Sequence, residues 1–248
     1  MKALIIAAVT VLSGVALAEF SATNLKANKM ECGAPVAPID FHYAVGHRFF
    51  ATVTPEKLHD ATSIYDLIPE DANWEQFNIY ATSISVYQQN HVNATNNSIT
   101  LNDEQKSVFS TLSYQDQIVL KASSWTKKDG SKREYDHDLV YYISIVPNIE
   151  ARYIDGHEEL MRFLKEGSKE TIKNAENWKL KPGKLSFTVS TKGEPKNAKL
   201  LNSCGYPEVD STMTALILTT KEKWLSALDA NNQPVEQELF ISFGQAGC

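Results

Sequence analysis

Side chains that could bind a metal ion are adjacent in the segment Asp136-His137-Asp138. Successive side chains of a β-strand point to opposite faces of the sheet. The two aspartates would therefore lie on one face and the histidine on the other, which makes a shared ion awkward. We expect these residues to be polar positions on an exposed strand.

A second acidic group follows His59-Asp60 and contains Asp66, Glu70 and Asp71. Carboxylates near a histidine could form a hydrolytic site, and the same residues around a proline are also typical of a solvated loop. An exported metal-dependent hydrolase, with one of these two acidic groups as its site, is therefore the alternative hypothesis for function.

The common sequence signatures of catalysis and cofactor binding do not occur in the chain. It has no Gly-x-Ser-x-Gly, no phosphate-binding loop, no dinucleotide fingerprint and no His-Glu-x-x-His. We therefore predict that the protein is not an enzyme, with no catalytic residue, no cofactor and no metal ion.

The three cysteines, Cys32, Cys204 and Cys248, do not follow the spacing of a zinc site. In an oxidising compartment they could form one disulfide and leave one thiol, or they could all remain free. A catalytic cysteine would need a histidine partner, which the spacing does not identify.

The N-terminus has the pattern of a secretory signal peptide. Lys2 precedes an apolar run from Ala3 to Val15, and Ala16-Leu17-Ala18 provides the small residues of a cleavage site. We predict a signal peptide at residues 1–18, cleavage after Ala18, a leader at residues 19–38 and export to the periplasm. The apolar run is shorter than the ~20 residues that span a bilayer, so we expect no retained transmembrane helix.

Composition and charge describe an ordinary folded protein that is poorly suited to nucleic acid. The chain has 248 residues, of which 43% are hydrophobic, and 24 Lys and Arg against 30 Asp and Glu give a net charge of -6. A nucleic-acid surface normally needs an excess of cations, so we predict no nucleic-acid partner.

Residues 39–147 are predicted to form a β-sandwich-like domain. The strand candidates are Arg48 to Val53, Gln76 to Gln88, and a hairpin of residues 117–125 and 139–146 that turns at Asp129-Gly130. Strand signals that recur every ten to fifteen residues favour a sandwich, with one short helix from Asn102 or Asp103.

Residues 148–248 change pattern after Pro147. Asp155, with Glu158 three residues later, predicts a capped helix. The rest of the expected order is a strand at 185–189, a strand at 195–201, a helix from Glu208 or Asp210 and a strand at 237–243. The order helix, strand, strand, helix, strand defines the fold class as α+β, with Trp224 packing the second helix onto the sheet.

Residues 147–243 resemble the C-terminal domain of TonB, the energy transducer of outer-membrane transport. The resemblance rests on an ordered set of short motifs. They are Tyr153-Ile154-Asp155-Gly156, the strand and turn from Leu185 to Gly193, Asn202-Ser203-Cys204-Gly205, Val209-Asp210, Lys223-Trp224-Leu225-Ser226-Ala227 and Gln233-Pro234-Val235. The chain departs from the family in having Ser226 for a proline, Cys204 for a serine and one glycine in place of a pair.

The resemblance implies a three-stranded antiparallel sheet whose first strand lies between the other two. It also implies that the last strand binds an extended peptide from a transporter by edge pairing, here through Glu236, Glu238, Phe240 and Ser242. The expected partner is an outer-membrane transporter, an envelope complex or a second copy of the chain.

The family's sheet also implies a disulfide between Cys204 and Cys248, with Cys32 free. In that sheet the second and third strands end at the same edge, near Leu201 and Phe243. Both cysteines follow those ends within a few residues. The bridge would hold the end of the chain against the sheet.

Residues 40–147 have a weaker resemblance to the periplasmic β-domains of GldM, a gliding-motility and secretion protein. It rests on residues 101–105, the long pair of strands and residues 125–130. It implies a second alternative, a structural component of an envelope secretion or motility machine.

Overall fold

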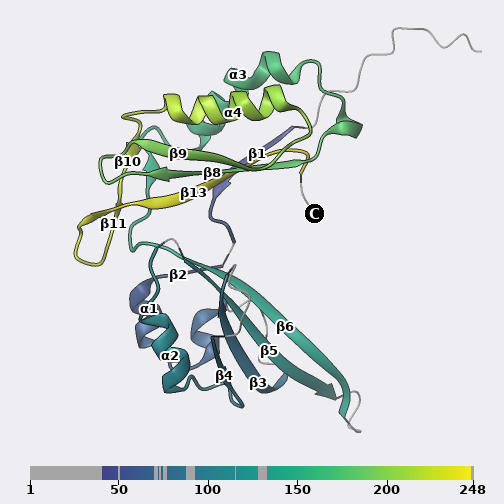
Figure 1. Ribbon diagram of the computed structural model, residues 1–248, viewed down its shortest axis with the longest axis vertical. Coiled ribbons are helices and arrows are strands. Elements are labelled where there is room, and N and C mark those ends of the chain that lie inside the picture. Colours follow the sequence, from purple (N-terminus) through teal and green to yellow (C-terminus); the bar gives the residue numbers. More distant parts are fainter. Residues whose placement is uncertain are drawn as a thin grey trace, which may run out of the picture. The chain divides into compact units, whose positions relative to one another are not determined.

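Two main β-sheets, each with its own hydrophobic core, make up the described part of the chain (Figure 1). The computed structural model describes residues 41–49, 51–69, 72, 74, 77–87, 93–114, 116–127 and 133–246. The fold contains both helices and sheets and is α+β, as predicted. Across these residues, no helix has the length and apolar character needed to cross a membrane.

The first main sheet has four antiparallel strands in the order β1-β13-β8-β9. Its strands are β1 (His42–Gly46), β13 (Gln237–Gly244), β8 (Pro182–Val189) and β9 (Pro195–Asn202). The position of β8 between β13 and β9, antiparallel to both, is the arrangement that the family resemblance implied. The predicted sheet had three strands, and β1 is the addition.

Two helices, α3 (His157–Ile172) and α4 (Pro207–Thr219), pack on one face of this sheet (Figure 1). Alternate residues of the central strands point to the helices, and Leu185, Phe187 and Val189 of β8 are fully buried there. The resulting core explains the alternation in the sequence. Other members of this core that are at most 1% exposed include Leu160, Leu164, Met213, Ile217, Ile241 and Phe243.

The start of α3 differs from the prediction. Its N-cap is Gly156, which has no side chain to donate or accept a capping hydrogen bond, and Asp155 lies one residue too early for that role. The Asp155 carboxylate instead binds the Lys223 ammonium at 3.1 Å. This ion pair joins the start of α3 to the segment that follows α4.

A buried aspartate holds the turn into α4. The Asp210 carboxylate accepts hydrogen bonds from the Ser203 hydroxyl at 2.5 Å and from the Cys204 backbone N–H at 3.0 Å. Asp210 and Cys204 are buried, which makes the bond between them costly to lose. The turn therefore gives a structural reason for an aspartate at the start of this helix.

Short ribbons and one 3₁₀ turn complete this part of the chain. Trp224 lies in β10 (Trp224–Leu225), which pairs with β7 (Arg152–Tyr153). The Trp224 ring is 5% exposed and contacts the rings of Tyr153 and Phe187, as predicted for a residue that packs onto the sheet. The other short elements are η4 (Asn177–Lys179) and the ribbon of β11 (Ala227–Leu228) and β12 (Pro234–Val235).

The second main sheet has five strands in the order β2-β6-β5-β3-β4. The predicted hairpin is confirmed, since β5 (Gln117–Lys127) pairs with β6 (Arg133–Ile145) in antiparallel register. The remaining strands are β2 (Ala51–Val53), β3 (Asn78–Val86) and β4 (Ala94–Asn96). The pairing of β2 with β6 is parallel.

Helices, rather than a second sheet, cover the core of this five-stranded sheet. The helices are α1 (Pro55–Asp60), η1 (Ile64–Leu67) and α2 (Asp103–Phe109) (Figure 1). Buried residues of all three helices share a cluster with Ile84, Ile118 and Leu120 of the strands. The predicted β-sandwich is therefore wrong for the described residues between 51 and 147. The short helices supply the apolar cover that a second sheet would have supplied.

Candidate functional site

The strand predicted to bind a partner at an open edge is already paired on both sides. β13 pairs with β8 from Gln237 to Gly244, and on its other side it pairs with β1 from Phe240 to Gly244. The strand β1 thus belongs with the C-terminal strands, although residues 39–147 were predicted to fold together. The expectation of an open β13 edge is therefore wrong for residues 240–244, and among the described residues no second strand pairs with residues 237–239.

The four predicted partner-binding side chains are only partly available. The Glu236 carboxylate forms an ion pair with Lys196 at the start of β9. Glu238, Phe240 and Ser242 alternate with the core residues of β13, so they lie on the sheet face opposite the helices. Phe240 is only 3% exposed. These residues therefore line a face of the sheet and not an unpaired edge.

Side-chain contacts hold β1 in place on the sheet. A hydrogen bond of 2.8 Å joins the Tyr43 hydroxyl to the Ser168 hydroxyl of α3, and burial raises the pKa of Tyr43. The Phe41 ring lies 4.9 Å from the Tyr43 ring and 6.4 Å from the Phe243 ring. The segment is therefore bound through both its backbone and its aromatic side chains.

The part of β13 beyond β1 borders a separate polar contact. The Gln237 side chain accepts a hydrogen bond from the Ala151 N–H at 2.7 Å and donates to the Glu150 carboxylate. His47 contacts the same carboxylate at 2.7 Å. Burial alone would raise the pKa of Glu150, but the bonds from His47 and Gln237 hold it below its ordinary value. A cavity of about 370 Å³ lies here, between Leu239 and the start of α3.

Two cations lie over the ring of Phe240. The Arg48 guanidinium is 4.8 Å from the ring centre and the Lys184 ammonium is 5.1 Å from it. Arg48 follows β1 by two residues, and Lys184 lies on β8. The Lys184 ammonium donates to the Arg48 backbone carbonyl at 3.1 Å. Burial, followed by the charge of Arg48, lowers the pKa of Lys184.

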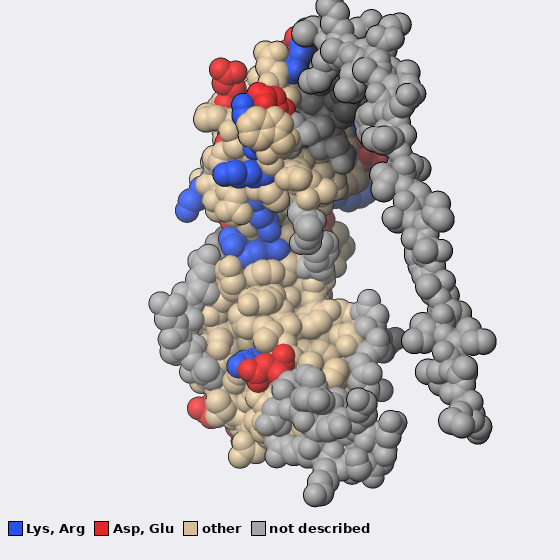
Figure 2. Space-filling view, turned by 90° about the vertical axis from the view of Figure 1, so that its right-hand side faces the viewer, with Lys and Arg blue, Asp and Glu red and all other residues tan. Residues whose placement is uncertain are grey.

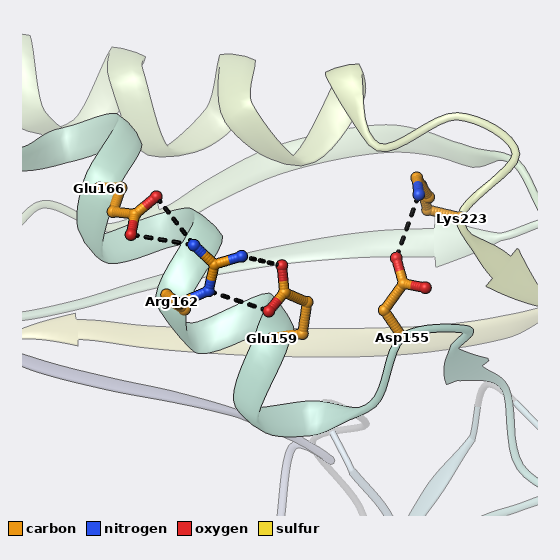
Figure 3. A network of polar contacts seen from close by, with 5 residues as sticks. All are labelled: Asp155, Glu159, Arg162, Glu166 and Lys223. Carbon is orange, nitrogen blue, oxygen red and sulfur yellow. Dashed lines mark hydrogen bonds and ion pairs between the residues drawn. The ribbon is translucent and has the colours of Figure 1, made fainter.

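Several charged groups on helix α3, by contrast, are neutralised by ion-pair partners. On the exposed face of α3, Arg162 binds the carboxylates of both Glu159 and Glu166 (Figure 3). These bonds raise the pKa of Arg162. Figure 2 shows several Lys and Arg side chains on one face of the molecule, some next to acidic side chains and others apart from them. The pair of Arg48 and Lys184 differs from Arg162 in having no carboxylate partner among the described residues.

The acidic groups considered as metal sites have structural partners instead. The Asp66 carboxylate accepts hydrogen bonds from the Thr62 and Ser63 N–H groups at the start of η1, and these bonds lower its pKa. Asp138 forms an ion pair with Lys121 at 2.7 Å. Glu70 and Asp71, together with the side chains of residues 136 and 137, lie outside the described set. Within that set, no three His, Cys, Asp or Glu side chains are arranged to hold a metal ion.

Cys204 is buried and has no disulfide partner among the described residues. Its predicted partner Cys248 lies outside those residues, as does Cys32. A Cβ placed on Gly244 would lie 3.0 Å from the Cβ of Cys204, so the end of β13 passes directly beside this cysteine. The position agrees with the sheet geometry that suggested the bridge. The pairing of Cys204 with Cys248 itself stays a prediction, which peptide mapping under non-reducing conditions would decide.

In protein whose disulfides have first been reduced, Cys204 should resist alkylation while the fold is intact. Its side chain is fully buried, and burial raises its pKa to about 12. Because only the thiolate reacts, we expect iodoacetamide at pH 8 to modify Cys204 slower by roughly a hundredfold or more than it does in unfolded chain. Mass spectrometry of protein treated with and without guanidinium checks this. Equal rates in the two states would show that the thiol is accessible.

Compared with protein-family models, curated proteins and solved structures, the chain gives no significant match. Any functional proposal must therefore be argued from residue contacts within the fold.

Sequence reasoning selected β13 as a site and did not include the charged groups beside it. Phe240 was predicted as a site residue, whereas Arg48 and Lys184 were not. Their separation of 136 residues hides their proximity. The only sequence signal was their position at the ends of predicted strands.

Proposed function

We propose that this chain is an exported, non-enzymatic binding protein of the periplasm. In this proposal its four-stranded sheet engages a protein partner by strand pairing, as the resemblance to the TonB C-terminal domain implies, and serves outer-membrane transport. The partner is a transporter or another envelope component.

The observation that carries the proposal is the pairing of β1 with β13. Five residues of β1, from His42 to Gly46, lie antiparallel to Phe240–Gly244. A strand edge that accepts an extended segment from elsewhere in the chain has the backbone geometry to accept one from a partner. In our proposal β1 occupies the place of the partner strand and is displaced when the partner binds.

Displacement of β1 is physically reasonable because the exchange conserves backbone hydrogen bonds. β1 is short, its residues are exposed or half-buried, and β13 keeps its eight-residue pairing with β8 when β1 leaves. The free-energy cost of displacement then comes mainly from the loss of the side-chain contacts of β1, such as the hydrogen bond between Tyr43 and Ser168. A partner strand that restores equivalent contacts would replace them.

A reversible crosslink between β1 and β13 tests the proposal. Ala44 lies directly opposite Ser242. Opposite residues of an antiparallel pair have Cα atoms about 4.5–5.5 Å apart, within the range of a disulfide. The double variant Ala44→Cys, Ser242→Cys, with Cys32 and Cys248 changed to serine, can therefore be locked by oxidation and released by reduction. We expect the reduced protein to capture a partner from the organism's envelope extract and the oxidised protein to lose it.

The two redox states are the matched control, because they differ only in the mobility of β1. Equal capture in both states would refute displacement of β1, and capture in neither state would refute partner binding. Proline substitutions in β13 are a poorer test, since β13 is an internal strand and its backbone bonds hold the sheet together.

A further inference from the structure

Arg48 has an unusual lack of hydrogen-bond acceptors. A guanidinium carries five N–H donors. The buried Nε of Arg48 has no partner, and no described residue accepts a hydrogen bond from any other nitrogen of this side chain. Among the described residues, the Arg48 guanidinium forms cation–π contacts with the ring faces of Tyr87, at 5.4 Å, and Phe240. Ring contacts attract the charge and leave the N–H groups without acceptors.

Lys184 adds a second charge that is also unneutralised. Its ammonium has a single described acceptor, the carbonyl oxygen of Arg48, and among the described residues no carboxylate lies within ion-pair distance. Two like charges in a half-buried place repel each other, which agrees with the lowered pKa of Lys184. An anion between the two side chains would remove this cost and would supply the missing acceptors.

Space for such an anion is present beside the two cations. A cavity of about 470 Å³ is lined by Arg48 and Lys184, and His42, Ser242 and Asn202 contribute further polar groups to its wall. Its size lies in the range of about 300–1,000 Å³ typical of small-molecule sites. An inorganic ion would fill a small part of it.

Another part of the wall of the cavity is apolar. Val45, Phe49, Phe240 and Phe243 line it together with backbone of β1 and β8. Apolar surface next to paired cations suits a ligand that has a charged end and an apolar or aromatic body. Carboxylate and phosphate groups both match a guanidinium in two-point geometry.

We infer that this cavity is a binding site for a small organic anion, with a carboxylate or phosphate held by Arg48 and Lys184 and an apolar body lying on the aromatic wall. The inference goes beyond the proposed function and does not depend on it, because the ligand would bind with β1 in its observed place.

Calorimetric titration of the full chain with phenyl phosphate and with phenylacetate tests the inference. We expect at least one of them to bind with a dissociation constant below about 1 mM. Arg48→Gln and Lys184→Gln should each weaken binding by at least about tenfold, since each removes one charge-assisted contact. Arg162→Gln is the matched control, because it removes an exposed arginine that already has two carboxylate partners, and it should leave binding unchanged.

Charge-conserving variants and further ligands complete the test of the anion site. Arg48→Lys and Lys184→Arg keep the charge and should retain measurable binding, which separates loss of the anion contact from loss of the fold. The tighter of the two aromatic probes identifies the preferred charged group. No binding by either probe, equal binding by benzyl alcohol, or unchanged binding in both glutamine variants would overturn the inference. Inorganic phosphate that binds as tightly as phenyl phosphate would overturn the role of the apolar wall.

Discussion

Gly193→Ala should destabilise the protein by about 3–5 kcal/mol, because two separate costs coincide at this residue. Gly193 has a φ of +75° in the turn between β8 and β9, a conformation that a side chain disfavours. A Cβ at this position would also lie 2.1 Å from the backbone carbonyl oxygen of Trp224. Urea unfolding followed by circular dichroism measures the change in the free energy of unfolding.

Gly156→Ala is the matched control for this prediction. Gly156 also has a positive φ, +90°, but no atom lies within 4 Å of the position that its Cβ would take. It should therefore show only the conformational cost of a side chain at φ 90° and ψ 167°, about 1–3 kcal/mol. An equal loss at the two glycines would mean that the Trp224 backbone moves aside freely, and that the close approach does not explain the glycine at residue 193.

The elements that the sequence predicted best are those with local signals. Apolar residues alternate with polar ones from Leu185 to Val189, and this pattern predicted β8. It arises because one face of that strand is wholly apolar and buried. Helix α2 followed from Asn102, whose side chain accepts a hydrogen bond from the Gln105 N–H at 2.8 Å in a capping box. Such signals involve residues within a few positions of one another, so they can be recognised in the sequence without knowledge of tertiary contacts.

The elements that were missed depend on distant contacts or on very short segments. Helix α1 buries only Leu58, so its sequence shows no helical repeat of apolar residues. Thr54-Pro55 is nevertheless a typical helix start. β1 ends in a glycine, buries no residue fully and pairs with a strand near the other end of the chain. Nothing local to His42–Gly46 identifies that partner, and the prediction of an open β13 edge failed for this reason.

The candidate anion site was hidden from the sequence for the same reason. The overall charge of -6 argues against cationic sites in general. The site depends on the pairing of β1, which brings Arg48 above Phe240. The net charge of the whole chain therefore does not reveal a local excess of positive charge that strand pairing creates.

Trp224→Ala should destabilise the protein by about 3–5 kcal/mol, as expected for removal of a large buried aromatic side chain. The ring centre of Trp224 lies 5.4 Å from that of Tyr153 and 5.2 Å from that of Phe187, so it joins β7, β8 and β10. Its Nε1 donates to the Thr220 hydroxyl at 2.9 Å, which ties the end of α4 to the same cluster. Equilibrium unfolding in urea, read by circular dichroism, gives the difference.

Trp178→Ala is the control, since it removes the same side chain from a position that is 78% exposed and contacts only Lys179 among the ring interactions of the described residues. It should change the free energy of unfolding by no more than about 0.5 kcal/mol. Trp224→Phe keeps the ring contacts and loses the N–H donor, so it should cost about 1–2 kcal/mol. If Trp224→Ala were no more destabilising than Trp178→Ala, the Trp224 cluster would not be part of the cooperative core.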